Sequence, residues 1–492
     1  MSIRSRLLIC AAPFALAGCA AGLGSAPPVT AGQAAPISAS ERQQGTQARD
    51  QIVSEYGGVY QNARVDAMAR RVGQRIAVQS GLSSDPGSFT VTVLDTPVNN
   101  AFATPGGYVY VTRGLMALMN DEAELAGVLG HEVAHVAARH SQKRQTASQT
   151  NSVLGALGQV LVGAVTGNSR LGQYLGQGIG TGAQLATLGY SRSQEAQADN
   201  LGVKYLKSAG YDTGALASVL DDLARQDALD QQLSGNTRSV PEWASTHPDS
   251  ADRVRAALTE AQQIGGTTLP RDRDAYLSAI DGMLYGDNPD NGIIDGRDFL
   301  HPKLRIAFTV PQGFTMSNSA QAVTIKGPNT QAMFSTAAYS GNLQNYVGKV
   351  LQDLGVSSGT SAPVQRTTIN GIPAAYAQTR ANTQSGQVDV TVFAYETSAN
   401  QAYHFVVLTP AGQGLGAAGS MVQSFRRLSA QQAAAIKPKY VRVVTVQSGD
   451  TPASLAARMA FTDHKLDRFL ALNGMSANAT LQAGQKVKIV TR

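Results

Sequence analysis

Apolar residues recur with helical spacing near the start of the chain. Between residues 41 and 79 the apolar stripe Val65, Met68, Val72 and Ile76 predicts amphipathic helices. The period changes to two in FTVTVLD, which predicts a strand, and NNAFATPGGYVYVTRG predicts a hairpin around residues 105–107. Helical patterning returns in LAGVLGHEVAHVAARHSQ (residues 125–142) and again from residue 194 to about 261.

The rest of the chain divides by composition and period. Residues 19–40 are rich in Pro, Ala, Gly and Ser and predict a flexible tether. Residues 151–190 are rich in Gly, Ala and Leu and favour loosely packed helices that form a cover, with membrane-surface contact as the alternative. Short alternating strands and two helices in residues 270–430 predict an antiparallel α+β module, and residues 440–492 form a last unit. The fold class expected is α+β.

Charge and cysteine usage narrow the function classes. The net charge of +6 is spread without Lys/Arg blocks, so no nucleic-acid partner is expected. Arg4 and Arg6 precede the apolar run LLICAAPFALAG, which predicts a signal peptide over residues 1–18. LAGC resembles a bacterial lipobox that would place a lipid on Cys19, and Ala20 after it matches an outer-membrane address. The alternative is an ordinary signal peptide that contains a cysteine.

Two histidines lie four residues apart in HEVAH. A helix turns about 100° per residue, so His131 and His135 share one face and Glu132 lies beside it. Zinc in catalytic sites takes three protein ligands and keeps one position for water, and Glu132 would accept a proton from that water. The alternative is a chance match on an amphipathic helix.

A second carboxylate pair follows downstream, in SRSQEAQADN. Glu195 and Asp199 lie at i and i+4 on one helical face, so Glu195 can supply a third ligand. Asp199 can hold a ligand histidine by its other ring nitrogen. Read alone, such a pair is most often a solvated helix face, and its place downstream of HEVAH favours the metal site instead.

Four motifs together resemble one family. NAFATPGGYVYVTRGLM, HEVAH, SRSQEAQAD and THPDSADR look like the gluzincin zinc metallopeptidase family of the CAAX prenyl proteases, HtpX and BepA, in that order. The resemblance implies a mainly helical zincin-type peptidase domain over residues 41–265 with a small edge-strand sheet and one Zn²⁺ per chain. The roles it implies are zinc binding by His131, His135 and Glu195, general acid and base catalysis by Glu132, and substrate pairing along Asn100, Ala101, Phe102 and Ala103.

Two further positions match this family. The resemblance implies that His247 and Arg253 reach the oxyanion of the reaction, or that His247 caps the metal as an auto-inhibitory fourth ligand. The alternative is a turn before a helix with a solvated Arg253. His140 is half a turn from His131 on a continued helix, so a surface position is predicted for it.

The C-terminus resembles a LysM module. VRVVTVQSGDT, LDRFLALNG and LQAGQKVKIV match its strand, helix and strand, a βααβ order that implies binding of N-acetylglucosamine glycans such as peptidoglycan. A packing or protein-contact role is the alternative.

The chain lacks an apolar run long enough to span a bilayer, which excludes the transmembrane topologies of the peptidase family. It also lacks the 34-residue helical repeats that BepA carries.

These features predict a zinc-dependent endopeptidase that is lipid-anchored to the outer membrane, in the periplasm of a Gram-negative-type bacterium. Its expected substrates are misfolded or stalled envelope proteins, and the outer-membrane assembly machinery and peptidoglycan are the expected further partners. One alternative is a zinc-containing chaperone, assembly or cell-wall-tethering factor with little turnover. Another is a peptidoglycan peptidase.

Overall fold

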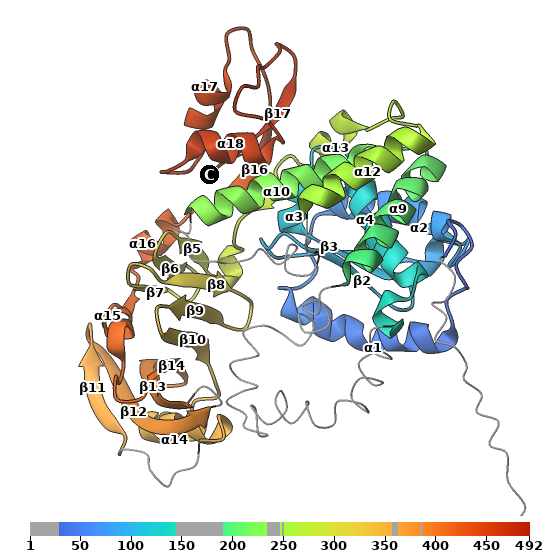
Figure 1. The fold of residues 1–492 in the computed structure, drawn as a ribbon. Helices are drawn as coiled ribbons and strands as arrows, with labels where there is room; N and C mark the ends of the chain where they lie inside the picture. Colours follow the sequence, from blue (N-terminus) through green and yellow to red (C-terminus); the bar gives the residue numbers. More distant parts are fainter. Residues whose placement is uncertain (1–28, 144–189, 234–246, 248–249, 357–362, 384–385) are drawn as a thin grey trace, which may run out of the picture.

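The computed structural model describes residues 29–143, 190–233, 247, 250–356, 363–383 and 386–492. Figure 1 shows a helical unit, a sheet-rich unit and a small C-terminal unit joined in one molecule. The expected α+β class is confirmed. The predicted signal peptide, Cys19 and most of the Gly-rich segment lie outside the described residues. None of the helices in the described part of the chain has the length and apolarity needed to cross a bilayer.

The first unit packs helices around a three-stranded sheet. Its helices are α1 (Ala39–Glu55), α2 (Ala63–Ala77), α3 (Arg113–Leu118), α4 (Glu122–Ala137), α9 (Arg192–Ala209), α10 (Ala215–Leu233), α12 (Ser250–Ile264) and α13 (Arg273–Ile280). The strands are β1 (Thr90–Leu94), β2 (Ala101–Thr104) and β3 (Tyr108–Thr112). The sheet order is β1-β3-β2, with β1 parallel and β2 antiparallel to β3. Strand β2 is therefore an edge strand of this sheet, as expected for its residues 101–103.

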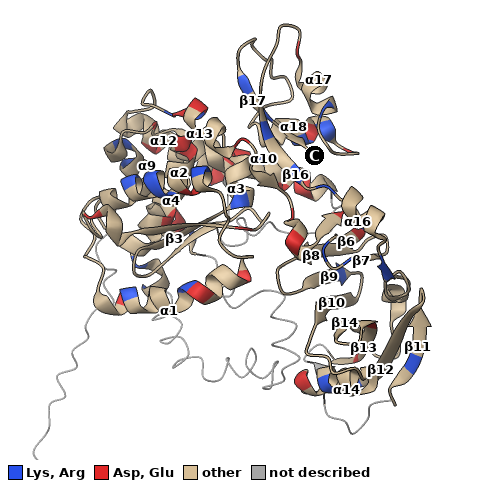
Figure 2. Cartoon of the chain, turned by 180° about the vertical axis from the view of Figure 1, so that it is seen from behind, with Lys and Arg blue, Asp and Glu red and all other residues tan. Residues whose placement is uncertain are grey.

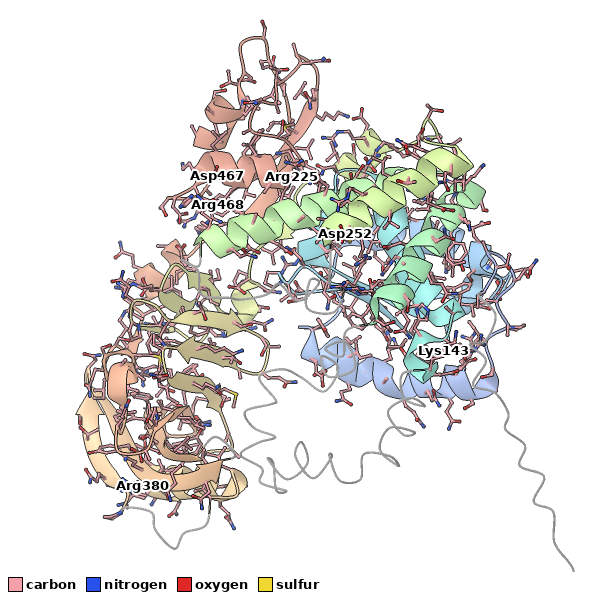
Figure 3. All side chains as sticks on the ribbon, viewed as in Figure 1. Lys143, Arg225, Asp252, Arg380, Asp467 and Arg468 are labelled. Carbon is pink, nitrogen blue, oxygen red and sulfur yellow. The ribbon has the colours of Figure 1, made fainter. Side chains whose placement is uncertain are left out.

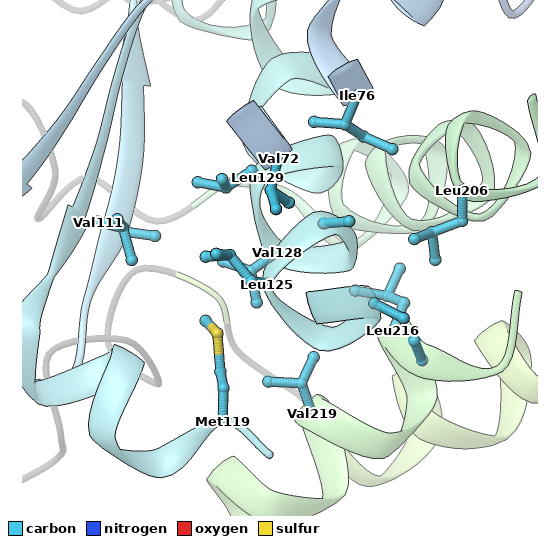
Figure 4. Packing of buried hydrophobic residues seen from close by; sticks show 14 of the residues in the cluster. Val72, Ile76, Val111, Met119, Leu125, Val128, Leu129, Leu206, Leu216 and Val219 are labelled. Atoms are coloured by element: carbon cyan, nitrogen blue, oxygen red, sulfur yellow. The ribbon is translucent and has the colours of Figure 1, made fainter. Parts of the chain in front are cut away.

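Helix α4 lies at the centre of this unit. Its apolar residues Leu125, Val128 and Leu129 are buried against side chains of α2, α9 and α10 (Figure 4). Glycines bring its neighbours close, because a Cβ atom on Gly127 would lie 3.2 Å from the Cα of Leu216 in α10. A Cβ atom on Gly202 of α9 would lie 3.3 Å from the backbone nitrogen of His131 in α4. The absence of side chains at these crossings allows α9 to approach the face of α4 that carries His131.

The described part of the expected tether is bound to the helical unit. Ala34 and Ile37 donate backbone hydrogen bonds to the carbonyls of Ser80 and Leu82, at 3.2 Å each. Ala34 is buried, and Ser38 caps α1 in a capping box with Glu41. Residues 29–38 thus differ from the flexible tether predicted from composition, because their backbone groups find fixed partners.

The second unit is built on a seven-stranded antiparallel sheet of order β11-β12-β13-β14-β10-β9-β8. Its strands are β8 (Thr315–Asn318), β9 (Val323–Gly327), β10 (Thr330–Thr336), β11 (Gln365–Ile369), β12 (Ile372–Thr383), β13 (Gly386–Ser398) and β14 (Gln401–Pro410). Helix α14 (Leu343–Asp353) covers one face with an apolar cluster. The other face packs on helix α15 (Gly419–Gln423) and on a four-stranded sheet. The strands of that sheet are β5 (Ile293–Asp295), β6 (Asp298–His301), β7 (Ile306–Thr309) and β15 (Arg426–Arg427).

A buried histidine makes the stability of the second unit pH-dependent. His404 on β14 is 2% exposed, and its Nδ1 lies 2.8 Å from the Tyr346 hydroxyl. Burial lowers the pKa of His404 to about 4, whereas an unfolded histidine has a pKa of about 6.5. The folded state therefore binds fewer protons in this window, and its stability falls by about 1.4 kcal/mol per pH unit as the pH drops from about 6.5 to about 4.

We expect amides of β13 and β14 to lose protection against hydrogen exchange between pH 7 and pH 5, after correction for intrinsic rates. The loss should be smaller in His404→Gln, which cannot titrate. An equal loss in both proteins would contradict the assignment to His404.

The helical unit extends past its expected end. We expected the accessory module to begin at residue 270, but Tyr276, Leu277, Ile280 and Met283 belong to the core of the first unit. The next strand, β4 (Leu284–Tyr285), pairs with β16 (Lys439–Thr445) of the C-terminal unit. Residues 273–285 therefore connect the first unit to the C-terminal one, and the sheets of the accessory module follow them.

The C-terminal unit has the expected βααβ order. Its elements are β16 (Lys439–Thr445), α17 (Pro452–Ala457), α18 (Lys465–Leu472) and β17 (Lys486–Thr491), and α16 (Ala430–Ala435) leads into it. Strands β16 and β17 are antiparallel, and β4 extends the sheet to the order β17-β16-β4. Helix α18 packs on α10, near the labelled Arg225 and Arg468 (Figure 3). Lys and Arg are interspersed with Asp and Glu over all three units (Figure 2).

Candidate metal centre

Four side chains from three parts of the helical unit converge on one point. His131 and His135 extend from α4, Glu195 from α9, and His247 from the chain before α12, and all four are buried. One ligand atom of each lies within 4.8 Å of the others. The structure therefore brings together the three predicted zinc ligands and the predicted fourth one.

The spacing of these atoms suits a tetrahedral ion. His131 Nε2 lies 2.9 Å from His135 Nε2 and 3.3 Å from His247 Nδ1, and Glu195 Oε1 lies 3.0 Å from His247 Nδ1. The carboxylate of Glu195 is 3.5 Å from Nε2 of both His131 and His135. Nitrogen and oxygen ligands about 2.0–2.1 Å from a zinc ion are about 3.3 Å apart at tetrahedral angles. The residues present thus fit the metal in number, chemistry and spacing.

Asp199 and Arg253 support two of these ligands. His131 Nδ1 lies 2.9 Å from Asp199 Oδ1, and Arg253 donates from Nε and Nη2 to the same carboxylate at 2.8 Å each. Arg253 Nη1 also lies 2.9 Å from Glu195. Burial acts to raise the pKa of Asp199, but the hydrogen bonds from Arg253 and His131 outweigh it and bring this pKa below its usual range. Asp199 is therefore a carboxylate that accepts from the outer nitrogen of His131, as the sequence suggested.

The contacts of Arg253 differ from those expected of an oxyanion donor. Its side chain is 6% exposed, and the guanidinium faces Asp199 and Glu195, with a further 3.4 Å contact from Nη1 to the carbonyl of His247. It is also not solvated, which removes the alternative of a surface arginine. The oxyanion role of Arg253 stays a prediction.

Glu132 lies beside the cluster without being part of it. Its Oε1 atom is 3.5 Å from His247 Nε2 and accepts no hydrogen bond from the described residues. Burial, followed by the charge of Glu195, raises the pKa of Glu132 well above its usual range. A carboxylate of this kind can take up a proton from a neighbouring water and release it again.

The predicted substrate strand lies next to the metal helix. Ala101, Phe102 and Ala103 belong to the edge strand β2, which packs on α4, and Asn100 precedes it. The backbone nitrogen of Asn100 donates to Thr112 Oγ1 at 3.0 Å, which fixes the start of the strand. Substrate pairing along β2 stays a prediction.

His140 corrects the sequence-based expectation. We expected it at the surface, but it is 0% exposed and its Nδ1 lies 2.9 Å from His135 Nδ1. The helical projection failed because α4 ends at Ala137 and Arg139 has a left-handed backbone with φ of 51°. This turn places His140 beside His135, next to the face of α4 that carries the metal ligands.

Two other residues of the site were missed. Tyr190 stacks on His135 with ring centroids 3.8 Å apart, and Gln197 Oε1 lies 3.0 Å from His140 Nε2. Tyr190 had no signal in the sequence. Gln197 is two positions from Glu195 on α9, and a search of that helix for a partner to His140 could have found it.

Comparison with known proteins assigns this region. Residues 63–261 match peptidase family M48. The metal cluster lies within the residues that match this family. Residues 444–490 match the LysM domain, so the resemblance drawn from the C-terminal motifs is confirmed as well.

Two curated proteins are similar to parts of this chain. The Beta-barrel assembly-enhancing protease of Escherichia coli O157:H7 is 30% identical over 182 residues, which are 36% of this chain and 36% of that protein. The Mitochondrial metalloendopeptidase OMA1 of Schizosaccharomyces pombe is 30% identical over 227 residues, 45% of this chain and 62% of that protein. The chain thus spans less than two thirds of the length of both. A crystal structure from Bacteroides thetaiotaomicron VPI-5482 aligns with a TM-score of 0.23 at 11% identity, over 33% of this chain and 57% of that one.

Proposed function

We propose that the protein is a zinc-dependent endopeptidase that binds one zinc ion per chain. The observation that supports this most is the placement of Glu132, a buried carboxylate that is adjacent to a complete ligand cluster but does not belong to it. A purely structural site has no use for such a group, whereas hydrolysis needs a proton acceptor beside the attacking water.

The residues divide the work of hydrolysis between them. A bound zinc ion would lower the pKa of a water molecule and polarise the substrate carbonyl. His131, His135 and Glu195 hold the ion, while Glu132 takes the proton of the attacking water and passes it to the leaving amine. Asp199 and Arg253 hold His131 and Glu195 in the geometry seen here.

The edge strand suggests the substrate class. An extended polypeptide can add to β2 as a further strand, with recognition through main-chain hydrogen bonds. Only chains with exposed, extended segments can bind in this way, so misfolded or stalled proteins are the proposed substrates. The name of the Escherichia coli relative supports a place near β-barrel assembly, and the lipobox at Cys19 supports a lipid anchor on the periplasmic face of the outer membrane.

The experiment that tests this proposal measures zinc content and cleavage of unfolded casein by the purified protein. We expect about one zinc per chain, loss of cleavage on chelation, and recovery when zinc is returned.

We further expect His247→Ala to keep zinc and cleave several-fold faster, because His247 Nδ1 lies inside the ligand cluster where water must enter. Zinc-loaded protein that cleaves neither casein nor an envelope protein, with or without His247, would contradict the proposal.

The second candidate is an assembly or tethering factor with little turnover. The fourfold ligand set of three histidines and Glu195 favours it, because structural zinc sites are closed. The LysM match supplies a route to the cell wall. The two functions differ in their dependence on Glu132, which a structural site does not need.

A further inference from the structure

His140 has polar partners on both sides, although it is completely buried. Its Nδ1 atom lies 2.9 Å from His135 Nδ1, and its Nε2 atom lies 3.0 Å from Gln197 Oε1. His135 Nε2 points the other way, toward the ligand cluster, 2.9 Å from His131 Nε2. The three side chains Gln197, His140 and His135 therefore form one hydrogen-bonded row that ends at the metal position.

The direction of each hydrogen bond in this row follows from the requirement that the metal-binding nitrogen of His135 carries no hydrogen. A neutral imidazole carries one N–H, and a metal ligand must present its bare nitrogen. If His135 binds through Nε2, its hydrogen is on Nδ1 and must be accepted by His140 Nδ1. The hydrogen of His140 is then on Nε2, where Gln197 Oε1 accepts it. Every nitrogen and oxygen in the row thus has the partner it needs.

We infer that His140 is a positioning residue, which accepts the Nδ1–H of His135 and so holds the Nε2 of that ligand toward the metal. This inference rests on the proposed function, because it assigns a role within the same metal site. It gives each helix histidine its own support, since Asp199 serves His131 in the same way.

A neutral support suits this position. Glu132, Glu195 and Asp199 already bring three carboxylates to the site, and Arg253 contacts two of them. A further carboxylate beneath His135 would add a buried negative charge that needs its own partner. A histidine supported by an amide accepts the same hydrogen bond without that charge.

The N-terminal segment holds His140 in place. Arg139, whose left-handed backbone turns the chain, donates from Nε to Glu41 at 3.1 Å and from Nη2 to the carbonyls of Ala35 and Pro36 at 3.2 Å each. Gln142 also donates to Glu41 at 3.2 Å. The turn is therefore fastened on both sides of His140, which fixes the direction of its ring.

The test compares two replacements of His140 that differ in one property. In His140→Asn the side-chain oxygen stands near the place of Nδ1 and can accept from His135, although the side chain is smaller. In His140→Leu the volume is largely kept but no acceptor remains. We expect zinc affinity, measured by competition with a chromogenic chelator, to fall about 10–100-fold in His140→Leu and by much less in His140→Asn. Gln197→Met should weaken binding in the same direction, because it removes the acceptor at the far end of the row.

Three further measurements keep the outcomes distinct. Circular dichroism of the zinc-free proteins checks folding, the absorption spectrum of bound Co²⁺ reports ligand geometry, and His404→Leu controls for loss of a buried histidine elsewhere. Wild-type affinity in His140→Leu, or equal losses in the Asn and Leu variants, would overturn the inference while leaving the proposed function intact. If His140→Leu does not fold, wild-type affinity in Gln197→Met overturns it. A wild-type protein that binds no zinc would overturn the proposed function and this inference together.

Discussion

Glu132→Gln is expected to lower the rate of casein cleavage by about 10²–10⁴-fold while the protein still binds one zinc ion per chain. Glutamine keeps the size of the side chain but cannot accept a proton, and the carboxylate of Glu132 is not among the four clustered ligands. The measurement pairs zinc content with initial cleavage rates. A structural zinc site would tolerate this change, so the same experiment separates the peptidase from the assembly factor.

The matched control for Glu132→Gln is Glu122→Gln on the same helix. Glu122 is also buried, but it lies at the start of α4, where it pairs with Arg71 outside the metal cluster. We expect Glu122→Gln to keep most of the cleavage rate per bound zinc. Equal activity in wild type and Glu132→Gln would contradict a general-base role for Glu132.

The ligands on α4 and α9 could be predicted because the motif that carries each of them lies within one helix, whereas His247, in the chain before α12, was expected from the family resemblance alone. The spacing of His131 and His135 on α4, and of Glu195 and Asp199 on α9, follows from helical rotation alone. The distance between the two helices could not be derived in that way. It depends on close crossings such as the one at Gly202, whose importance appears only when both helices are in place.

Prediction failed where a local rule no longer applied. His140 was projected along a helix that in fact ends before it, and nothing in the sequence marks Arg139 as the left-handed residue. Residues 29–38 have the composition of a linker, but their backbone is held by partners more than forty positions away, at Ser80 and Leu82. Both features depend on tertiary contacts, which composition and periodicity do not report.

The contact that attaches the C-terminal unit to the helical unit could not be predicted from the sequence either. Lys488 belongs to VKIV, a strand pattern in which a lysine reads as a solvent-facing residue. In the structure it is 0% exposed, and its Nζ donates to the carbonyls of Ala117, Leu118 and Met119 at 2.9, 2.8 and 2.6 Å. These are the last carbonyls of α3 and the residue after it, which have no partners inside that helix. Lys488, in the region that matches the LysM domain, therefore caps a helix in the region that matches peptidase family M48.

Lys488→Met is consequently expected to destabilise the protein by about 3 kcal/mol or more, because a buried acceptor that loses its donor costs about 1–3 kcal/mol and three carbonyls lose theirs. Methionine approximates the length of lysine but leaves three carbonyls without a donor. It also removes an amine whose pKa burial lowers to about 7, against the opposing charges of Glu124 and Asp222. The measurement is urea unfolding, together with hydrogen exchange of residues 117–119 and of α18, where protection should fall if the two units separate.

Lys486→Met is the matched control on the same strand, because Lys486 forms a partly exposed pair with Asp274 and should change stability by less than about 1 kcal/mol. Zinc content should be unchanged in both variants, since the ligands lie toward the other end of α4 from these carbonyls. Equal stability of Lys488→Met and Lys486→Met would show that the C-terminal unit is held by its apolar contacts, and that the lysine cap contributes little.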